Sequence, residues 1–212
     1  MKKRVGCAVV AALLLLCPLT GCKKKGDTGY VPVQRSIEEV QAITAPLLEP
    51  MLETYRVYLG EVAYDEAAPA PFNKKENVAF YRVTDERFSS MTELRIYTET
   101  AFSAGCASRA FYDEMLIGGA GADKLHFREQ DGVLYVNPAL TGTWDSTLVP
   151  ESMTLIRQAY NTILVSYDLL TQGVPDGKAV VMFKRSEAGW RVDNTPAEAI
   201  SPEYRQYLEP AE

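Results

Sequence analysis

The stretch KLHFREQDGVLYVNP, residues 124–138, is where the hydrophobic pattern of this chain changes from a helical period to a strand period. Apolar and polar residues alternate on both sides of Asp131-Gly132, as they do in half-buried strands. Asp-Gly is a strong signal for a two-residue hairpin turn, because both residues tolerate the positive φ that such a turn requires. The stretch therefore predicts an antiparallel hairpin with strands over 124–130 and 133–138.

Before this hairpin, apolar residues recur every three or four positions, which is typical of amphipathic helices. Ser36 and Glu39 have the spacing of a capping box and predict a helix over residues 37–59. Pro46 and Pro50 lie inside it, so we expect a kink or a division into two helices. The same reasoning predicts a strand and two further helices, over residues 78–84, 91–103 and 107–116.

After the hairpin the pattern is that of strands joined by short turns. We expect four strands and a short terminal helix, over residues 151–161, 162–170, 179–187, 190–194 and 197–209. Helices thus come first and antiparallel strands follow, which predicts an α+β fold with N-terminal helices packed on one face of a curved antiparallel sheet. Residues 36–212 are enough for a single domain with one sizeable core.

Residues 1–21 have the layout of an export signal, with a basic start, an apolar run that is too short to span a bilayer, and small residues after Pro18. The last residues, Leu19-Thr20-Gly21-Cys22, resemble a bacterial lipobox. The resemblance implies cleavage before Cys22 and a diacylglyceryl thioether on its sulfur. Residues 22–35 would then be a lipidated tether, and the protein would be anchored at the outer face of the cell membrane. The alternative is an ordinary secretory signal with a chance cysteine.

Cysteine usage limits how the fold can be stabilised. The chain has four cysteines, of which Cys7 and Cys17 lie in the expected signal and Cys22 would carry lipid. Only Cys106 remains in the domain, so no intramolecular disulfide can form there. The fold must therefore be held by its hydrophobic core.

Charge restricts the class of partner. The chain carries 22 basic and 28 acidic residues, with a net charge of −6. Without the three basic residues of the signal and the three lysines at 23–25, the balance is 16 against 28, or −12. A domain this acidic excludes nucleic acid as a partner and favours basic proteins. The tether lysines would instead attract anionic headgroups, with about 1 kcal/mol each.

The residues available for catalysis are few. The only histidine, His126, is expected to be a polar strand residue, and Cys106 a small buried filler. One histidine and one free cysteine do not make a usual zinc site. The run Gly118-Gly119-Ala120-Gly121 lacks the strand and the lysine of a phosphate-binding loop. We therefore expect no enzyme activity, no metal and no cofactor.

Three segments carry a family resemblance: FYRVTDERFSSMTELRIYTETAFS, LHFREQDGVLYVNPALTGTWD and FKRSEAGWRVDN, all within residues 78–194. In this order they resemble the IseA-type D,L-endopeptidase inhibitors of Gram-positive bacteria and related lipoproteins. The resemblance implies a cystatin-like fold with two lobes around a crevice. It also implies binding to the catalytic domain of cell-wall-cleaving cysteine peptidases and inhibition of them. Wall hydrolases tend to be basic, and an acidic surface would speed association with them.

Two sets of residues are candidates for contact with a partner or a ligand. Segment 137–151 is a long predicted loop with Trp144, Asp145 and Glu151. Trp144 is either an interface hot spot or a lid over the end of the sheet. The second set would line the crevice or, alternatively, serve as core aromatics: Tyr81, Tyr97 and Tyr135.

Two other classes of function stay open at this point. A small-ligand binding protein would use an apolar crevice between helices and sheet. An enzyme would need a pocket carboxylate with a raised pKa, in the manner of isomerases on a related fold.

Overall fold

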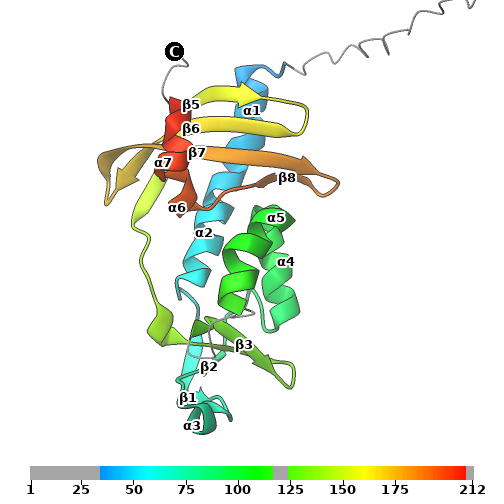
Figure 1. Ribbon diagram of the computed structural model, residues 1–212, viewed down its shortest axis with the longest axis vertical. Helices are drawn as coiled ribbons and strands as arrows, with labels where there is room; N and C mark the ends of the chain where they lie inside the picture. Colours follow the sequence, from blue (N-terminus) through cyan, green and yellow to red (C-terminus); the bar gives the residue numbers. More distant parts are fainter. Residues whose placement is uncertain (1–33, 117–123, 209–212) are drawn as a thin grey trace, which may run out of the picture. The chain divides into compact units, whose positions relative to one another are not determined.

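The computed structural model describes residues 34–116 and 124–208 (Figure 1). The predicted signal, Cys22 and all but the last two residues of the predicted tether lie outside the described residues, as does the glycine-rich run at 118–121. Within the described part, no helix has the length and apolar character needed to cross a bilayer.

The N-terminal helix is divided as its prolines predict. α1 (Ile37–Thr44) is followed by the 3₁₀ turn η1 (Ala45–Leu47), which contains Pro46, and then by α2 (Leu48–Tyr58). The predicted capping box is confirmed, since the Glu39 amide donates to Ser36 Oγ at 3.2 Å and the Ser36 amide donates to the Glu39 carboxylate at 2.7 Å.

The first sheet, sheet A, contains the hairpin on which the sequence analysis opened. Its strands are antiparallel in the order β1-β2-β4-β3. Asp131 and Gly132 have φ of 53° and 75°, as the predicted turn requires. The elements of this part are β1 (Tyr64–Pro69), α3 (Asn73–Glu76), β2 (Tyr81–Val83), β3 (Phe127–Gln130) and β4 (Val133–Val136).

Between β2 and β3 lie the two further helices that the periodicity predicted. They are α4 (Met91–Ala101) and a second helical stretch made of α5 (Ala104–Ala107) and the π-helical η2 (Ser108–Leu116). α4 contacts β3 of the first sheet and β8 of the second. This helix therefore lies between two sheets rather than on one face of a single sheet.

The second sheet, sheet B, is an antiparallel meander in sequence order. α1 and α2 pack against its first strand, and two short helices and a 3₁₀ turn follow its last. The elements are β5 (Ser146–Gln158), β6 (Thr162–Thr171), β7 (Val174–Ser186), β8 (Gly189–Val192), α6 (Pro196–Ala199), α7 (Pro202–Arg205) and η5 (Gln206–Leu208).

The mixed α+β class is confirmed, but the expectation of one curved sheet is wrong, because the described residues form two four-stranded sheets. The division arises after β4, where the chain turns through η4 (Pro138–Leu140) and runs along the end of α2. There the Gly142 amide donates to the Leu59 carbonyl at 2.8 Å. The Gly142 amide is thus bonded to the end of α2 and does not pair with a strand of sheet A. The next strand, β5, belongs to the second sheet.

Helices and both sheets share one continuous hydrophobic core. At its centre the Phe111 ring stacks on Tyr58 at 4.3 Å and meets the edge of Phe102 at 5.1 Å. Tyr58 in turn contacts Phe127 of sheet A, and its hydroxyl bonds to Thr98 Oγ1 at 2.8 Å. A smaller cluster lies within sheet A around Phe72 and Phe80.

A buried amide joins the closing strand to sheet B. Asn194 is fully buried; its side chain accepts from the Met182 amide and donates to the Val180 carbonyl, both at 2.9 Å. Asn194→Ala leaves both backbone groups without a partner, so we expect the free energy of unfolding in urea to fall by about 2–4 kcal/mol. Asn161→Ala, at an exposed turn position, should change it by less than about 0.5 kcal/mol. Equal stabilities of the two variants would contradict the role assigned to Asn194.

Candidate functional site

Trp144, a predicted contact residue, packs against the hydrophobic core. Its indole meets the Tyr55 ring edge-on at 5.4 Å between centroids, and its carbonyl accepts from Arg56 Nε at 3.4 Å. The indole N–H is buried and has no hydrogen-bond partner among the described residues. Trp144 therefore covers the side of α2 and fixes the segment that carries Asp145.

Part of the predicted loop over 137–151 is strand, which corrects its boundaries. β5 already begins at Ser146, and its first four residues pair with the end of β6. The register then shifts between Val149 and Thr154, so Pro150 and Glu151 lie in a bulge. Ser152 Oγ holds the bulge, because it accepts from the Asp168 amide and donates to the Val149 carbonyl, both at 2.7 Å. The proline marks an irregularity inside a strand rather than its beginning.

Asp145 is brought to the tip of the β6–β7 hairpin. Its carbonyl accepts from the Gln172 amide at 3.1 Å, and its carboxylate accepts from Gln172 Nε2 at 3.3 Å. Beside it, Ser146 Oγ and Thr171 Oγ1 are 2.7 Å apart, and Thr171 Oγ1 donates to the Asp176 carboxylate at 2.7 Å. Two adjacent sets of hydrogen bonds thus hold two exposed aspartates at the same end of sheet B.

We call this end of sheet B the acidic end, defined by Asp145, Glu151, Asp168 and Asp176. Lys178 is the single basic residue within segments 144–151 and 168–178, and it pairs with Asp168 at 2.6 Å. Both partners are about half exposed, so solvent screens this pair. The surface is therefore rich in carboxylates and only partly neutralised.

Sequence reasoning found Asp145 and Glu151 but missed Asp168 and Asp176. These two were assigned to a strand and to a turn, and nothing in their local pattern indicates that they lie near Asp145. Only the β5–β6 register, in which Ser146 pairs with Thr171, shows that Asp168 and Asp176 lie near Asp145. That register is a long-range pairing, which a short window of sequence does not contain.

The three predicted crevice tyrosines do not line one crevice. Tyr81 and Tyr135 point to opposite faces of sheet A, because Arg82, the neighbour of Tyr81, is the residue paired with Tyr135. Tyr135 packs on Phe72 in the small cluster of sheet A. Tyr97 lies on α4, and its hydroxyl accepts from Arg87 Nη1 at 3.4 Å.

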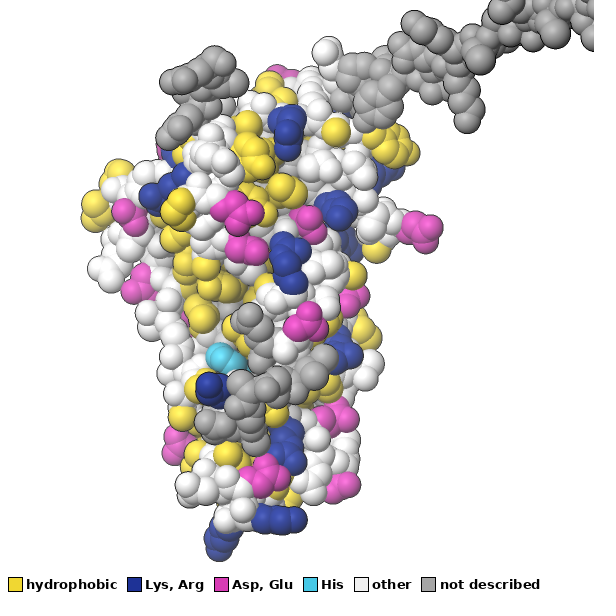
Figure 2. Space-filling view, in the orientation of Figure 1, with side chains coloured by type: hydrophobic (Ala, Val, Ile, Leu, Met, Phe, Trp, Pro, Cys, Tyr) yellow, Lys and Arg dark blue, Asp and Glu magenta, His cyan; other side chains and the backbone are white. Residues whose placement is uncertain are grey.

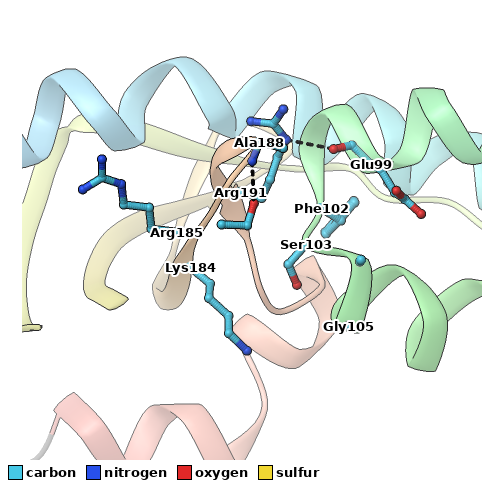
Figure 3. Close-up of a pocket in the computed structure, with 10 residues that line it drawn as sticks. Glu99, Phe102, Ser103, Gly105, Lys184, Arg185, Ala188 and Arg191 are labelled. Carbon is cyan, nitrogen blue, oxygen red and sulfur yellow. Dashed lines mark hydrogen bonds between the residues drawn. The ribbon is translucent and has the colours of Figure 1, made fainter. Parts of the chain in front are cut away.

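A hollow lies between the α4–α5 junction and the β7–β8 hairpin (Figure 3). Its volume is about 240 Å³, and its lining includes Phe102, Ser103, Lys184, Arg185 and Arg191. Successive residues of a strand point to opposite faces, and Lys184 and Arg185 extend in different directions in Figure 3. The cations therefore do not converge on a single point in this hollow.

Neither Cys106 nor His126 lies in an environment that favours nucleophilic chemistry. Cys106 is fully buried, as expected, and burial raises the pKa of its thiol to about 12, so it stays protonated at neutral pH. His126 lies just before β3 and is visible in Figure 2 beside hydrophobic side chains. Burial lowers its pKa below the ordinary value, and its Nδ1 is buried without a partner among the described residues.

Within residues 34–116 and 124–208, no group of three or more His, Cys, Asp or Glu side chains is arranged to hold a metal ion. No protein-family model matches the chain, and a search of curated proteins finds no significant match.

Proposed function

We propose that this protein is an extracytoplasmic lipoprotein, anchored to the cell membrane through Cys22, that binds and inhibits cell-wall D,L-endopeptidases without being an enzyme itself. The observation that carries the proposal is the acidic end of sheet B, where hydrogen bonds to Gln172 and to Thr171 hold Asp145 and Asp176 at the same hairpin. Complementary charge accelerates association with a basic partner. The family resemblance of residues 78–194 supplies the class of partner.

The proposal includes a cystatin-like arrangement of part of the chain. It is supported by the meander β5–β8 and by α1, which packs on β5 and whose Thr44 accepts a 2.7 Å hydrogen bond from Tyr167 of β6. Sheet A, with α3 and the cluster around Phe72, would be the second lobe.

Small-ligand binding has less support. The hollow beside β8, at about 240 Å³, is below the roughly 300–1,000 Å³ of typical small-molecule sites. Two larger hollows, of about 350 Å³ beside Val78 and about 470 Å³ beside Glu187, are open depressions of the surface rather than enclosed pockets. The three tyrosines that would have lined a crevice lie apart. A protein surface, in contrast, needs no deep cavity, and the exposed carboxylates of the acidic end fit that requirement.

The test mixes the mature chain from residue 22, carrying Cys22→Ser, with several purified D,L-endopeptidase catalytic domains. We expect a complex at or below micromolar concentration and loss of peptidase activity. Asp145→Asn combined with Asp176→Asn should slow association by about tenfold at low salt, with little change in dissociation. Each asparagine keeps an oxygen that can accept the existing hydrogen bond, so the fold is preserved.

A matched control removes two carboxylates from exposed positions elsewhere, with Glu66→Gln and Glu86→Gln. This pair has the same net charge as the test pair but should associate several-fold faster. Absence of any complex across several enzymes would exclude the inhibitor function. Equal slowing in both pairs would show that net charge, and not the acidic end, guides binding.

A further inference from the structure

The end of sheet B opposite the acidic end has a different surface. It holds the β5–β6 turn, the β7–β8 turn and the N-terminal start of the described chain, which lie together in Figure 1. We call it the basic end and define it by Arg35, Tyr160, Arg185 and Trp190, together with Lys184, which lies on the opposite face of the same strand. The acidic end lies at the β6–β7 turn, at the opposite end of the same strands.

Arg35 binds the β5–β6 turn. Its backbone amide donates to Gln158 Oε1 at 3.0 Å, and its guanidinium donates to the carbonyls of Ala159 and Tyr160 at 3.2 and 3.1 Å. The same guanidinium lies over the Trp190 ring, 5.0 Å from the centroid. These acceptors are neutral, so the positive charge of Arg35 is not cancelled by them.

Arg185 repeats this combination of cation and aromatic ring. Arg185 pairs with Trp190 across the β7–β8 hairpin. Its guanidinium lies 5.9 Å from the centroid of the Tyr160 ring, and Tyr160 is 56% exposed. Lys184 is 53% exposed and is 4.0 Å from Asp193. Among the ion pairs of the described residues, none involves Arg35 or Arg185.

Several acidic residues lie near the basic end, and one of them, Glu39, accepts a hydrogen bond from the backbone. Glu39 caps the start of α1 through the Ser36 amide, and Glu38 is in the same first turn. Glu187 lies in the β7–β8 turn. Arg191, on the neighbouring strand, donates to the carbonyls of Glu99 and Trp190, which are neutral acceptors. Four cations at this end, Arg35, Lys184, Arg185 and Arg191, are matched by four carboxylates, those of Glu38, Glu39, Glu187 and Asp193. This end is therefore close to neutral, whereas the domain as a whole is strongly acidic.

The basic end is also where the chain continues toward Cys22. Twelve residues lie between Cys22 and Arg35, and the thirteen residue-to-residue steps span at most about 45 Å when fully extended. The same segment contains Lys23, Lys24 and Lys25. A lipid anchor at Cys22 would therefore hold the basic end close to the bilayer.

We infer that the basic end of sheet B binds anionic lipid headgroups and so orients the domain on the membrane; the inference rests on the anchor proposed for Cys22. Arginine and lysine attract phosphate groups, and tyrosine and tryptophan favour the boundary between headgroups and water. With the basic end against the membrane, the acidic end faces outward, where a wall hydrolase can reach it. The anchor then supplies orientation as well as location.

The test uses the mature chain from residue 22 with Cys22→Ser, so that binding does not depend on the lipid. Vesicles of phosphatidylcholine with 30% phosphatidylglycerol, about a physiological anionic fraction, are compared with pure phosphatidylcholine by sedimentation at low salt. We expect binding to the anionic vesicles only. Lys184→Gln combined with Arg185→Gln should weaken the partition coefficient by about twentyfold. Lys184→Arg with Arg185→Lys keeps both charges and should bind as the parent does.

The matched control is Lys74→Gln with Lys75→Gln, which removes two exposed cations from α3 beside sheet A. It should bind within about twofold of the parent. Equal binding of both glutamine pairs would assign the interaction to the tether lysines and overturn the inference. Displacement by millimolar inorganic phosphate at constant ionic strength, or binding to purified anionic wall polymer but not to vesicles, would also overturn it. Labelling of Cys22 with palmitate tests the anchor itself and is independent of these outcomes.

Discussion

Cys22→Ser is expected to abolish incorporation of radioactive palmitate into the protein completely. The thioether requires the cysteine sulfur, and no other residue of the lipobox-like segment can replace it. When residues 1–21 are also exchanged for an ordinary cleavable secretory signal, the protein should move from the membrane pellet to the soluble extracytoplasmic fraction. Acyl burial contributes about 0.8 kcal/mol per methylene, so the ratio of bound to free protein should fall by at least about a hundredfold.

The control for this experiment is Cys17→Ser, within the expected signal and upstream of the expected cleavage point. That variant should incorporate palmitate as the parent does. Labelling that persists in Cys22→Ser, or that is lost in Cys17→Ser, would contradict anchoring through Cys22. Intact mass of the purified protein gives a second readout, because cleavage before residue 22 and diacylglyceryl addition have defined masses.

Phe111→Ala should destabilise the domain by about 3–5 kcal/mol, measured as the free energy of unfolding of the mature Cys22→Ser chain in urea. Phe111 is fully buried and contacts Tyr58 of α2 and Phe102 at the end of α4. Truncation removes both ring contacts and leaves a cavity between the helices. Since one core joins the helices to both sheets, probes on either sheet should report the same transition.

Two further variants serve as references for the stability loss of Phe111→Ala. Phe111→Leu keeps most of the apolar volume and should cost clearly less than the alanine variant. Ile96→Ala, at a position that is 62% exposed on α4, should change stability by less than about 0.5 kcal/mol. Separate transitions for the two sheets, or an alanine variant as stable as Ile96→Ala, would contradict a shared core centred on Phe111.

The positions of the charged residues in sheet B modify the expectation that follows from the net charge of the domain. A net charge of −12 beyond the tether lysines predicts repulsion from anionic lipid, and this holds for the domain as a whole. The structure places Asp145 and Asp176 at one end of sheet B and Arg35 and Arg185 at the other. Opposite ends can therefore meet different partners. The salt dependence of each interaction should be measured separately, because screening weakens both.

Local structure was predictable wherever a short segment carries its own signal. The Ser36 capping box, the break at Pro46, the helix that begins at residue 91 and the Asp131-Gly132 turn were all confirmed. Each depends on hydrogen bonds or φ values within a few residues. β5 was predicted too short, from residue 151, whereas it begins at Ser146 and continues through the bulge that contains Pro150.

The candidate site was less predictable. Asp145 and Glu151 were identified from their segment, but the network that joins Asp145 to Gln172 needs the β5–β6 pairing. The prediction that Tyr81, Tyr97 and Tyr135 line one crevice was wrong, because residue type does not show which face of a sheet a tyrosine occupies. The β2–β4 register decides it, and it places Tyr81 and Tyr135 on opposite faces.

The α+β class, the main helices and hairpins, the single cysteine of the domain and its acidic balance could be predicted, because these features depend on residue type and on the spacing of a few residues. Long-range contacts were needed to show that the strands divide into two sheets, that Trp144 covers α2, and that Asp145 and Asp176 lie at the opposite end of sheet B from Arg35 and Arg185. These features depend on contacts between residues far apart in the chain. Such contacts form only when helices and sheets bury a common core, and no local pattern encodes their register.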